Sequence, residues 1–111
     1  MIFVYGSLRR GCANHHLLEG AEFVGPGTIE ASLYMRGDLS MAHEGPGTVH
    51  GEVYRLGEVN HLHTLDGLER HPTWYERRMT AVTLRDGCKL DAWCYFKAER
   101  DPEARLVESA S

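Results

Sequence analysis

The sequence predicts an α+β fold, a small mixed β-barrel of about six strands with one main flanking helix. Short apolar segments with period-two alternation recur along the chain, glycine-containing turns separate them, and one segment alone has helical spacing. A chain of 111 residues is long enough to bury a core and too short for two domains. We therefore expect one domain over residues 1–111, whose curled sheet holds one small ligand in its mouth.

The first predicted strand covers residues 2–5, where β-branched and aromatic side chains suit a buried, pleated surface. Gly6 ends this strand. A turn or two of helix is expected near residues 14–18, because Asn14 is a good N-cap residue and two leucines follow it.

Two further strands are expected in the middle of the chain. Residues 27–37 alternate apolar and polar side chains between two glycines, and residues 47–57 alternate as well. Gly51 lies inside the second of these segments, where glycine is favoured only at a bend or a close backbone approach. We therefore expect the second strand to bend there.

The main helix is predicted within residues 57–72, whose apolar residues recur at three-residue steps and end before Pro72. Gly67 weakens this helix by roughly 1 kcal/mol relative to alanine. The segments 75–87 and 89–97 then form a hairpin through an Asp-Gly turn. The charged tail from residue 99 to 111 is expected to fray or to pack as a short surface turn.

Composition excludes several classes of partner. The net charge is −4, and the basic residues are spread along the chain, so no nucleic-acid footprint is expected. No apolar window approaches the length of a membrane span and no signal peptide is recognised, so we expect a cytoplasmic protein without a membrane partner. Cys12, Cys88 and Cys94 lack CxxC spacing, which favours reduced thiols, with Cys94 in the core.

The loop after the first strand is suited to an anion. Gly6 brings the backbone close to another group, Ser7 offers a hydroxyl and an N–H, and two positive charges follow at Arg9 and Arg10. We expect the N–H groups of residues 6–9 to point into the barrel cavity.

Metal and covalent chemistry are not expected. His61 and His63 are two apart on the predicted helix and face different directions, so they do not have metal-ligand geometry. Ser7 lacks a GxSxG context and Cys12 lacks evident activation, so neither is expected to act as a nucleophile. No nucleotide motif is recognised, and no cofactor is predicted.

Six short segments resemble one known family. In order they are VYGSLRRG, NHHLL, GEVYRL, LDGLE, YERR and AWCYF, and over residues 2–96 they resemble the γ-glutamylcyclotransferase-like family, in particular its small γ-glutamylamine cyclotransferase branch. The resemblance implies a small β-barrel with strands in mixed directions. It also implies cyclisation of a γ-glutamyl small-molecule substrate: the α-amine attacks the γ-carbonyl, which releases an amine or amino acid and leaves 5-oxoproline.

This chemistry requires a base for the α-ammonium, whose reference pKa is about 7.7–8.0, and donors for an oxyanion and a carboxylate. Glu69 matches the family's catalytic glutamate, and an acidic residue at a helix C-terminus opposes the helix dipole, which favours a functional role. The glycine loop with Tyr5, Gly6, Ser7 and Leu8 is expected to bind substrate.

Further candidates follow from position. Tyr75 matches a family residue that faces the active site, while Tyr5 places its ring in the core and its hydroxyl either there or toward the cavity. Asp66 is either a second acid or a capping or surface residue, the latter being favoured. Arg77 shares a strand face with Tyr75 and is expected to form a structural ion pair with Asp66 or Glu69.

One alternative function remains open, a non-catalytic barrel that binds a carboxylated small molecule or a partner's terminus in the same pocket. Glu69 favours the enzyme, because a pocket that only binds a carboxylate gains nothing from a second negative charge. The leaving amine and the oligomeric state are not determined by the sequence.

Overall fold

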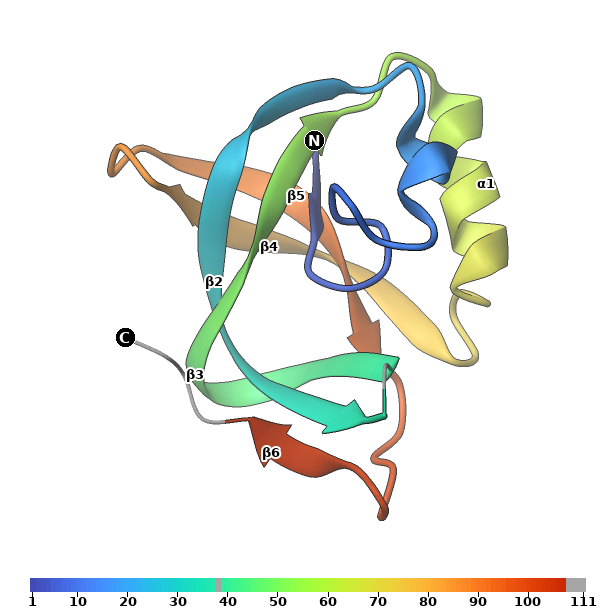
Figure 1. Cartoon of the computed structure of the whole chain (residues 1–111), viewed down its shortest axis with the longest axis vertical. Helices are drawn as coiled ribbons and strands as arrows, with labels where there is room; N and C mark the ends of the chain where they lie inside the picture. The colour runs from blue at the N-terminus through green and yellow to red at the C-terminus, as the bar shows by residue number, and fades with distance from the viewer. Residues whose placement is uncertain (38, 108–111) are drawn as a thin grey trace.

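The computed structural model describes residues 1–37 and 39–107, and it confirms the mixed barrel with one main helix. The elements in chain order are β1 (Ile2–Val4), the 3-10 helix η1 (His15–Leu18), β2 (Glu22–Arg36), β3 (Leu39–Arg55), α1 (Val59–Leu68), β4 (Tyr75–Leu84), β5 (Lys89–Lys97) and β6 (Arg105–Val107). The strands pair in the order β3-β1-β5-β4-β2, and a further β2–β3 pairing closes this ring of five. Figure 1 shows α1 on one side of the barrel.

The barrel is mixed because β1 runs parallel to β5, whereas β1–β3, β2–β3, β2–β4 and β4–β5 are antiparallel. The hairpin of β2 and β3 is longer than the alternation predicted, since its pairing extends from Glu22↔Arg55 to Arg36↔Leu39. Gly27 and Gly47, which begin the predicted segments, lie inside these strands instead. The pairing shifts register between Phe23 and Gly25 and between Glu30 and Ser32.

Strand β1 is buried on both faces, which explains its continuous apolar sequence. Phe3 packs in the barrel core with Cys94, as expected for that cysteine, whereas Ile2 packs with Leu65 of α1. Gly51 of β3 lies at a close backbone approach, the other of the two reasons considered for glycine there, because a Cβ atom would stand 2.2 Å from the Val4 carbonyl oxygen.

The prediction for the tail was wrong in its described part. Residues Arg105–Val107 form β6, which lies outside the barrel and pairs antiparallel with β2 through Leu33↔Val107 and Met35↔Arg105. The free edge of β2 accepts this strand, and Arg36 Nη1 holds the preceding turn through Asp101 Oδ2 at 3.1 Å. Residues 108–111 lie outside the described part of the chain.

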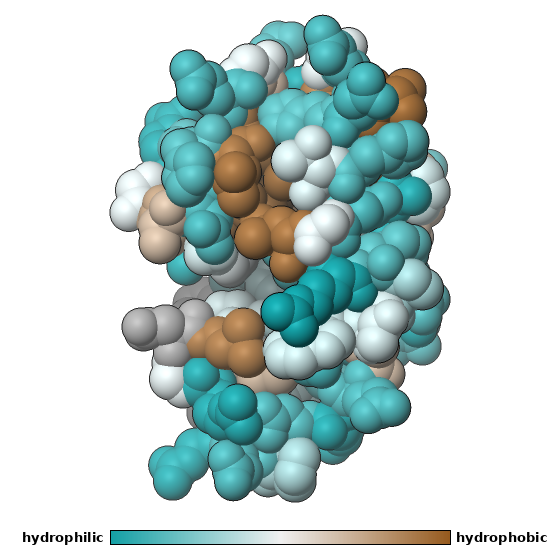
Figure 2. All heavy atoms as spheres, turned by 90° about the vertical axis from the view of Figure 1, so that its right-hand side faces the viewer, coloured by the Kyte–Doolittle hydropathy of each residue, from teal (hydrophilic) through white to brown (hydrophobic). Residues whose placement is uncertain are grey.

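The main helix is shorter than predicted, and the short helix after residue 14 is not capped as predicted. The helix predicted within 57–72 is observed as Val59–Leu68, and Asn14 precedes η1 but its side chain donates to Ser7 Oγ at 2.8 Å instead of capping. Among the residues that the structure describes, no helix combines the length and apolar character needed to cross a bilayer. Figure 2 shows that the face carrying α1 is largely polar, with an apolar area beside a hollow.

Candidate active site

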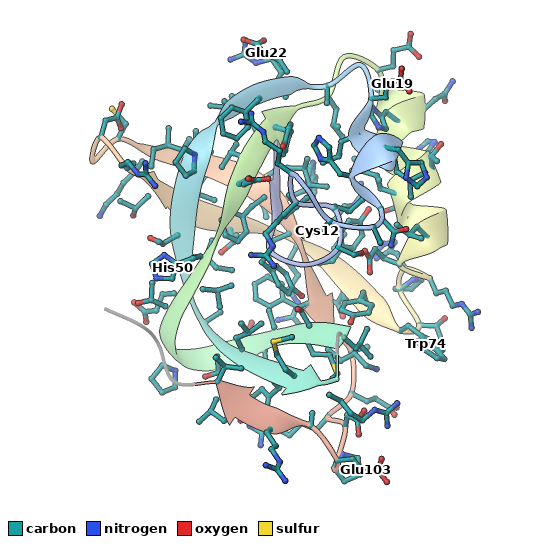
Figure 3. All side chains as sticks on the ribbon, viewed as in Figure 1. Cys12, Glu19, Glu22, His50, Trp74 and Glu103 are labelled. Atoms are coloured by element: carbon teal, nitrogen blue, oxygen red, sulfur yellow. The ribbon has the colours of Figure 1, made fainter. Side chains whose placement is uncertain are left out.

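A pocket of about 80 Å³ opens where the loop after β1 meets the starts of β3 and β4 and the end of α1. Drug-sized ligand sites are several times larger, roughly 300–1,000 Å³, so this pocket suits a small polar group. It is lined by Phe3, Val4, Tyr5, Gly6, Ser7, Leu8, Leu39, Ser40, Glu69, Tyr75 and Tyr95. All six candidate residues therefore lie together, although the sequence separates them into two groups. Figure 3 shows these elements meeting on one side of the barrel, with Trp74 at the outer edge.

The end of α1 positions Glu69. Arg70 adopts a left-handed conformation (φ 52°), and the N–H groups of His71 and Arg70 donate to the carbonyls of Asp66 (2.9 Å) and Gly67 (3.3 Å). This is the Schellman arrangement that ends many helices, although the left-handed position holds arginine where glycine is preferred. The Glu69 carbonyl accepts the N–H of Tyr75 at 3.2 Å, so the two pocket residues are tied through the backbone.

The Glu69 carboxyl is partly buried, and no described residue donates a hydrogen bond to it. Its side chain makes no hydrogen bond or ion pair with any residue in the ranges 1–37 and 39–107. Burial raises its pKa above the usual range, to about 7. A carboxyl with this pKa exchanges a proton readily near neutral pH, which is the property of a general acid and base.

Three tyrosines surround this carboxyl, and each donates its hydroxyl proton to another acceptor. Tyr5 Oη donates to the Tyr95 carbonyl at 2.6 Å and accepts the Ala42 N–H at 3.1 Å. Tyr75 Oη donates to the Ser40 carbonyl at 2.8 Å, and Tyr95 Oη donates to Asp66 Oδ1 at 2.6 Å. Burial raises the pKa of all three hydroxyls, so they stay neutral.

The loop of residues 6–8 uses its carbonyl oxygens as acceptors, whereas its N–H groups meet no acceptor among the described residues. The Gly6 carbonyl accepts from Arg9 N at 3.1 Å, the Ser7 carbonyl accepts from Asn14 N at 2.9 Å, and His15 Nδ1 lies 3.0 Å from the Leu8 carbonyl. The N–H groups of Gly6, Ser7 and Leu8 have no acceptor within the described part of the chain. The prediction that the Arg9 N–H also points into the cavity was wrong, because this N–H closes a turn by donating to the Gly6 carbonyl.

The two arginines of this loop do not bring positive charge to the pocket. Arg9 donates from Nε to the Gly6 carbonyl at 3.1 Å, and the Arg10 guanidinium lies 4.1 Å from the centre of the Phe23 ring. Neither lines the pocket, and the sequence-based view of them as part of an anion site was wrong. The groups that this loop offers to an anion in the pocket are therefore its backbone N–H groups and the Ser7 hydroxyl.

Four residues were missed or placed differently by the sequence. Leu39 and Ser40 line the pocket from the unassigned start of β3, and Tyr95 lines it from β5. Asp66 is neither a cap nor a surface residue, because it accepts the Tyr95 hydroxyl and pairs with Arg77 Nε at 3.5 Å. This contact confirms the ion pair predicted for Arg77.

No group of three or more His, Cys, Asp or Glu side chains in the described ranges has an arrangement suited to a metal ion.

Comparisons with known proteins assign the chain to a family. It matches the family described as "Gamma-glutamyl cyclotransferase, AIG2-like" over residues 2–111. It is also 35% identical over 101 residues to a protein of Methanocaldococcus jannaschii that is named provisionally as a γ-glutamylcyclotransferase, covering 88% of this chain and 84% of that protein.

Solved structures agree with this assignment. The crystal structure of an AIG2-like protein from Mus musculus has a TM-score of 0.85 at 29% identity, covering 99% of this chain and 86% of that one. The solution structure of the protein YtfP from Escherichia coli has a TM-score of 0.72 at 37% identity, covering 97% and 91%. The fold, the order of the pocket segments and these matches show that the chain belongs to the AIG2-like γ-glutamyl cyclotransferase family.

Proposed function

We propose that this pocket cyclises a γ-glutamyl amide to 5-oxoproline. The α-amine nitrogen of the substrate attacks its own γ-carbonyl carbon, a new C–N bond closes the five-membered ring, and the bond to the leaving nitrogen breaks. Starting from the α-ammonium, the attacking nitrogen loses two protons and the leaving nitrogen gains two and departs as an ammonium, so no water, oxidant or other reactant is consumed.

The Glu69 carboxyl is the observation that supports this proposal most directly. It faces a small pocket, has no donor among the described residues and has a pKa of about 7 because it is buried. The reference pKa of an α-ammonium is about 7.7–8.0, so the two groups are closely matched for proton transfer. Glu69 takes a proton from the α-ammonium so that the free amine can attack, and it then delivers a proton to the departing nitrogen.

The loop opposite Glu69 supplies the binding groups. Unused N–H groups of Gly6, Ser7 and Leu8 hold the substrate α-carboxylate and the oxyanion that develops on the γ-carbonyl. Tyr5 and Tyr75 form the apolar walls of the pocket, and their hydroxyls fix the start of β3 through Ala42 and Ser40. The leaving amine stays open, whether an amine, a lysine side chain or an amino acid.

Release of 5-oxoproline from a panel of γ-glutamyl compounds tests the proposal. The panel contains a γ-glutamyl amino acid, γ-glutamyl-ε-lysine and a simple γ-glutamylalkylamine, and we expect turnover of at least one. Glu69→Gln keeps the shape of the side chain without the basic oxygen, so turnover falls by roughly 10²–10⁴-fold while substrate binding survives.

Glu19→Gln is the matched control, because Glu19 is exposed and does not line the pocket. Figure 3 labels its position. It should leave turnover unchanged. A folded protein that binds 5-oxoproline yet turns over no member of the panel would be a binding module instead of an enzyme.

A further inference from the structure

The direction of the Tyr95 hydroxyl sets it apart from the other two pocket tyrosines. Tyr5 and Tyr75 donate to backbone carbonyls, whereas Tyr95 donates to a side chain, Asp66 Oδ1, at 2.6 Å. Asp66 lies three residues before Glu69 at the end of α1, and residues at this spacing are neighbours on one helix face. The carboxyl groups of Asp66 and Glu69 therefore both lie near the Tyr95 hydroxyl, and Asp66 accepts its hydrogen bond.

A cation explains why Asp66 is the acceptor. Arg77 Nε lies 3.5 Å from Asp66 Oδ1, and its guanidinium stacks 4.5 Å from the centre of the Trp93 ring. Hydrogen bonds to an ionised acceptor are roughly twice as strong as neutral ones, so a charged, paired carboxylate attracts the hydroxyl. Glu69 has no such cation among the described residues, and its protonation equilibrium lies near neutrality.

We propose that Asp66 is a positioning residue, which holds the Tyr95 hydroxyl away from Glu69 so that the Glu69 carboxyl stays free for the substrate. A hydrogen bond from Tyr95 would stabilise the Glu69 carboxylate, lower its pKa and make it a weaker base. The catalytic consequence rests on the proposed function, but the geometric claim does not.

Among the acceptors that hold the hydroxyls around Glu69, Asp66 is the one that a substitution can remove. Tyr5 faces Glu69 from the position directly after β1, Tyr75 from β4, and Tyr95 with the buried thiol of Cys94 from β5. The hydroxyls of Tyr5 and Tyr75 are held by main-chain carbonyls, which no substitution removes. Asp66, on the helix of Glu69 and backed by Arg77, is the one side-chain acceptor in this ring of described groups.

Titration of the Glu69 carboxyl, followed by NMR with ¹³C-labelled glutamate and assigned with Glu69→Gln, measures this effect directly. Asp66→Asn removes the charge but keeps an acceptor oxygen for Tyr95. Asp66→Ala removes both the charge and the acceptor oxygen, so the Tyr95 hydroxyl turns to Glu69. The midpoint of the Glu69 titration should then lie about one pH unit below the midpoint in Asp66→Asn. Adding Tyr95→Phe to Asp66→Ala should return the midpoint to the Asn level.

Two results would overturn the inference. If the double variant titrates like Asp66→Ala, the shift comes from the lost charge or from a freed Arg77, and Tyr95 plays no part. If Tyr95→Phe alone raises the midpoint, its hydroxyl already bonds to Glu69 in the native protein. The single Tyr95→Phe variant keeps the Asp66–Arg77 pair, so it decides the geometry even if Asp66→Ala does not fold.

Activity separates this inference from the proposed function. The acid limb of kcat/KM should follow the NMR midpoint through the series if Glu69 carries the proton. Midpoints that move as expected without any movement of the acid limb would leave the positioning of Tyr95 intact and reject Glu69 as the proton carrier.

Discussion

Two glycines in neighbouring parts of the barrel are present for different reasons. At Gly51 a Cβ atom would stand 2.2 Å from the Val4 carbonyl oxygen and 2.7 Å from the Phe3 ring, so packing of β1 against β3 demands glycine. At Gly6 a Cβ atom would meet only Ser40, with its Cβ at 3.6 Å, and Gly6 is not among the residues with positive φ. Neither packing nor backbone conformation requires glycine at the pocket.

This difference separates structural from functional constraint. The crossing at Gly51 is filled by the protein itself, so a change there acts on stability. The space beside Gly6 is part of the pocket, so a change there acts on whatever enters it. The same contrast applies to Glu69, whose burial without a donor destabilises the ionised protein while it supplies a base.

The largest effect is expected for Gly51→Ala. The added methyl group overlaps a main-chain oxygen, so β1 and β3 must separate, and we expect a loss of roughly 3 kcal/mol or more in the free energy of unfolding. Urea denaturation measures it. Gly57→Ala is the control, because a Cβ there meets nothing within 4 Å. A Gly51→Ala protein as stable as wild type would show that the barrel has slack at this crossing.

Glu69→Gln should stabilise the protein in a pH-dependent way. The folded-state pKa of Glu69 is raised to about 7. Wild type therefore has its full stability below the unfolded-state pKa of this carboxyl, and part of that stability is lost as the pH rises through 7. Gln removes that loss. Relative to wild type, the variant should therefore gain roughly 1–3 kcal/mol between pH 5 and pH 8, reduced by contact with water at the pocket mouth.

Urea denaturation of both proteins at the two pH values gives this difference, with Glu19→Gln as the exposed control. A constant difference between the variant and wild type across the range would mean that Glu69 is not perturbed by burial.

Gly6→Ala should reduce ligand binding without affecting the fold. The methyl group lies against Ser40 at an ordinary contact distance and takes space in the pocket, so 5-oxoproline should bind about tenfold more weakly or worse, which corresponds to roughly 1.4 kcal/mol. Calorimetric titration measures the affinity. Undiminished binding, with the fold verified by circular dichroism, would place the ligand elsewhere.

The sequence predicted the part of the site that local pattern encodes. The strand ending at Gly6 and the helix ending near Glu69 follow from short-range apolar spacing, and the resemblance to one family joined them. The sequence therefore predicts residues on both walls of the pocket, and the structure places these residues around one cavity.

The missed part depends on contacts that no local pattern encodes. Ser40 reaches the pocket because β3 continues through glycines that suggested a turn, and Tyr75 then binds its carbonyl. Asp66 meets Tyr95 only through the docking of α1 on β5, and its position on the helix gave no sign of this partner. Strand β6 likewise depends on the free edge of β2.

The smallest effect is expected for Gly67→Ala. Gly67 differs from Gly51 and Gly6, because neither packing nor space for a ligand explains a glycine there. Gly67 lies in the last turn of α1, is not among the residues with positive φ, and a Cβ there meets nothing within 4 Å. Alanine is favoured over glycine in helices by up to about 1 kcal/mol, so the variant should be more stable by roughly 0.5–1 kcal/mol, with pocket affinity unchanged. Thermal and urea denaturation measure the gain, and calorimetry with 5-oxoproline serves as the control. A loss of affinity without a loss of stability would show that Gly67 lets the end of α1 adjust as Glu69 engages its ligand, and would move this glycine into the same class as Gly6.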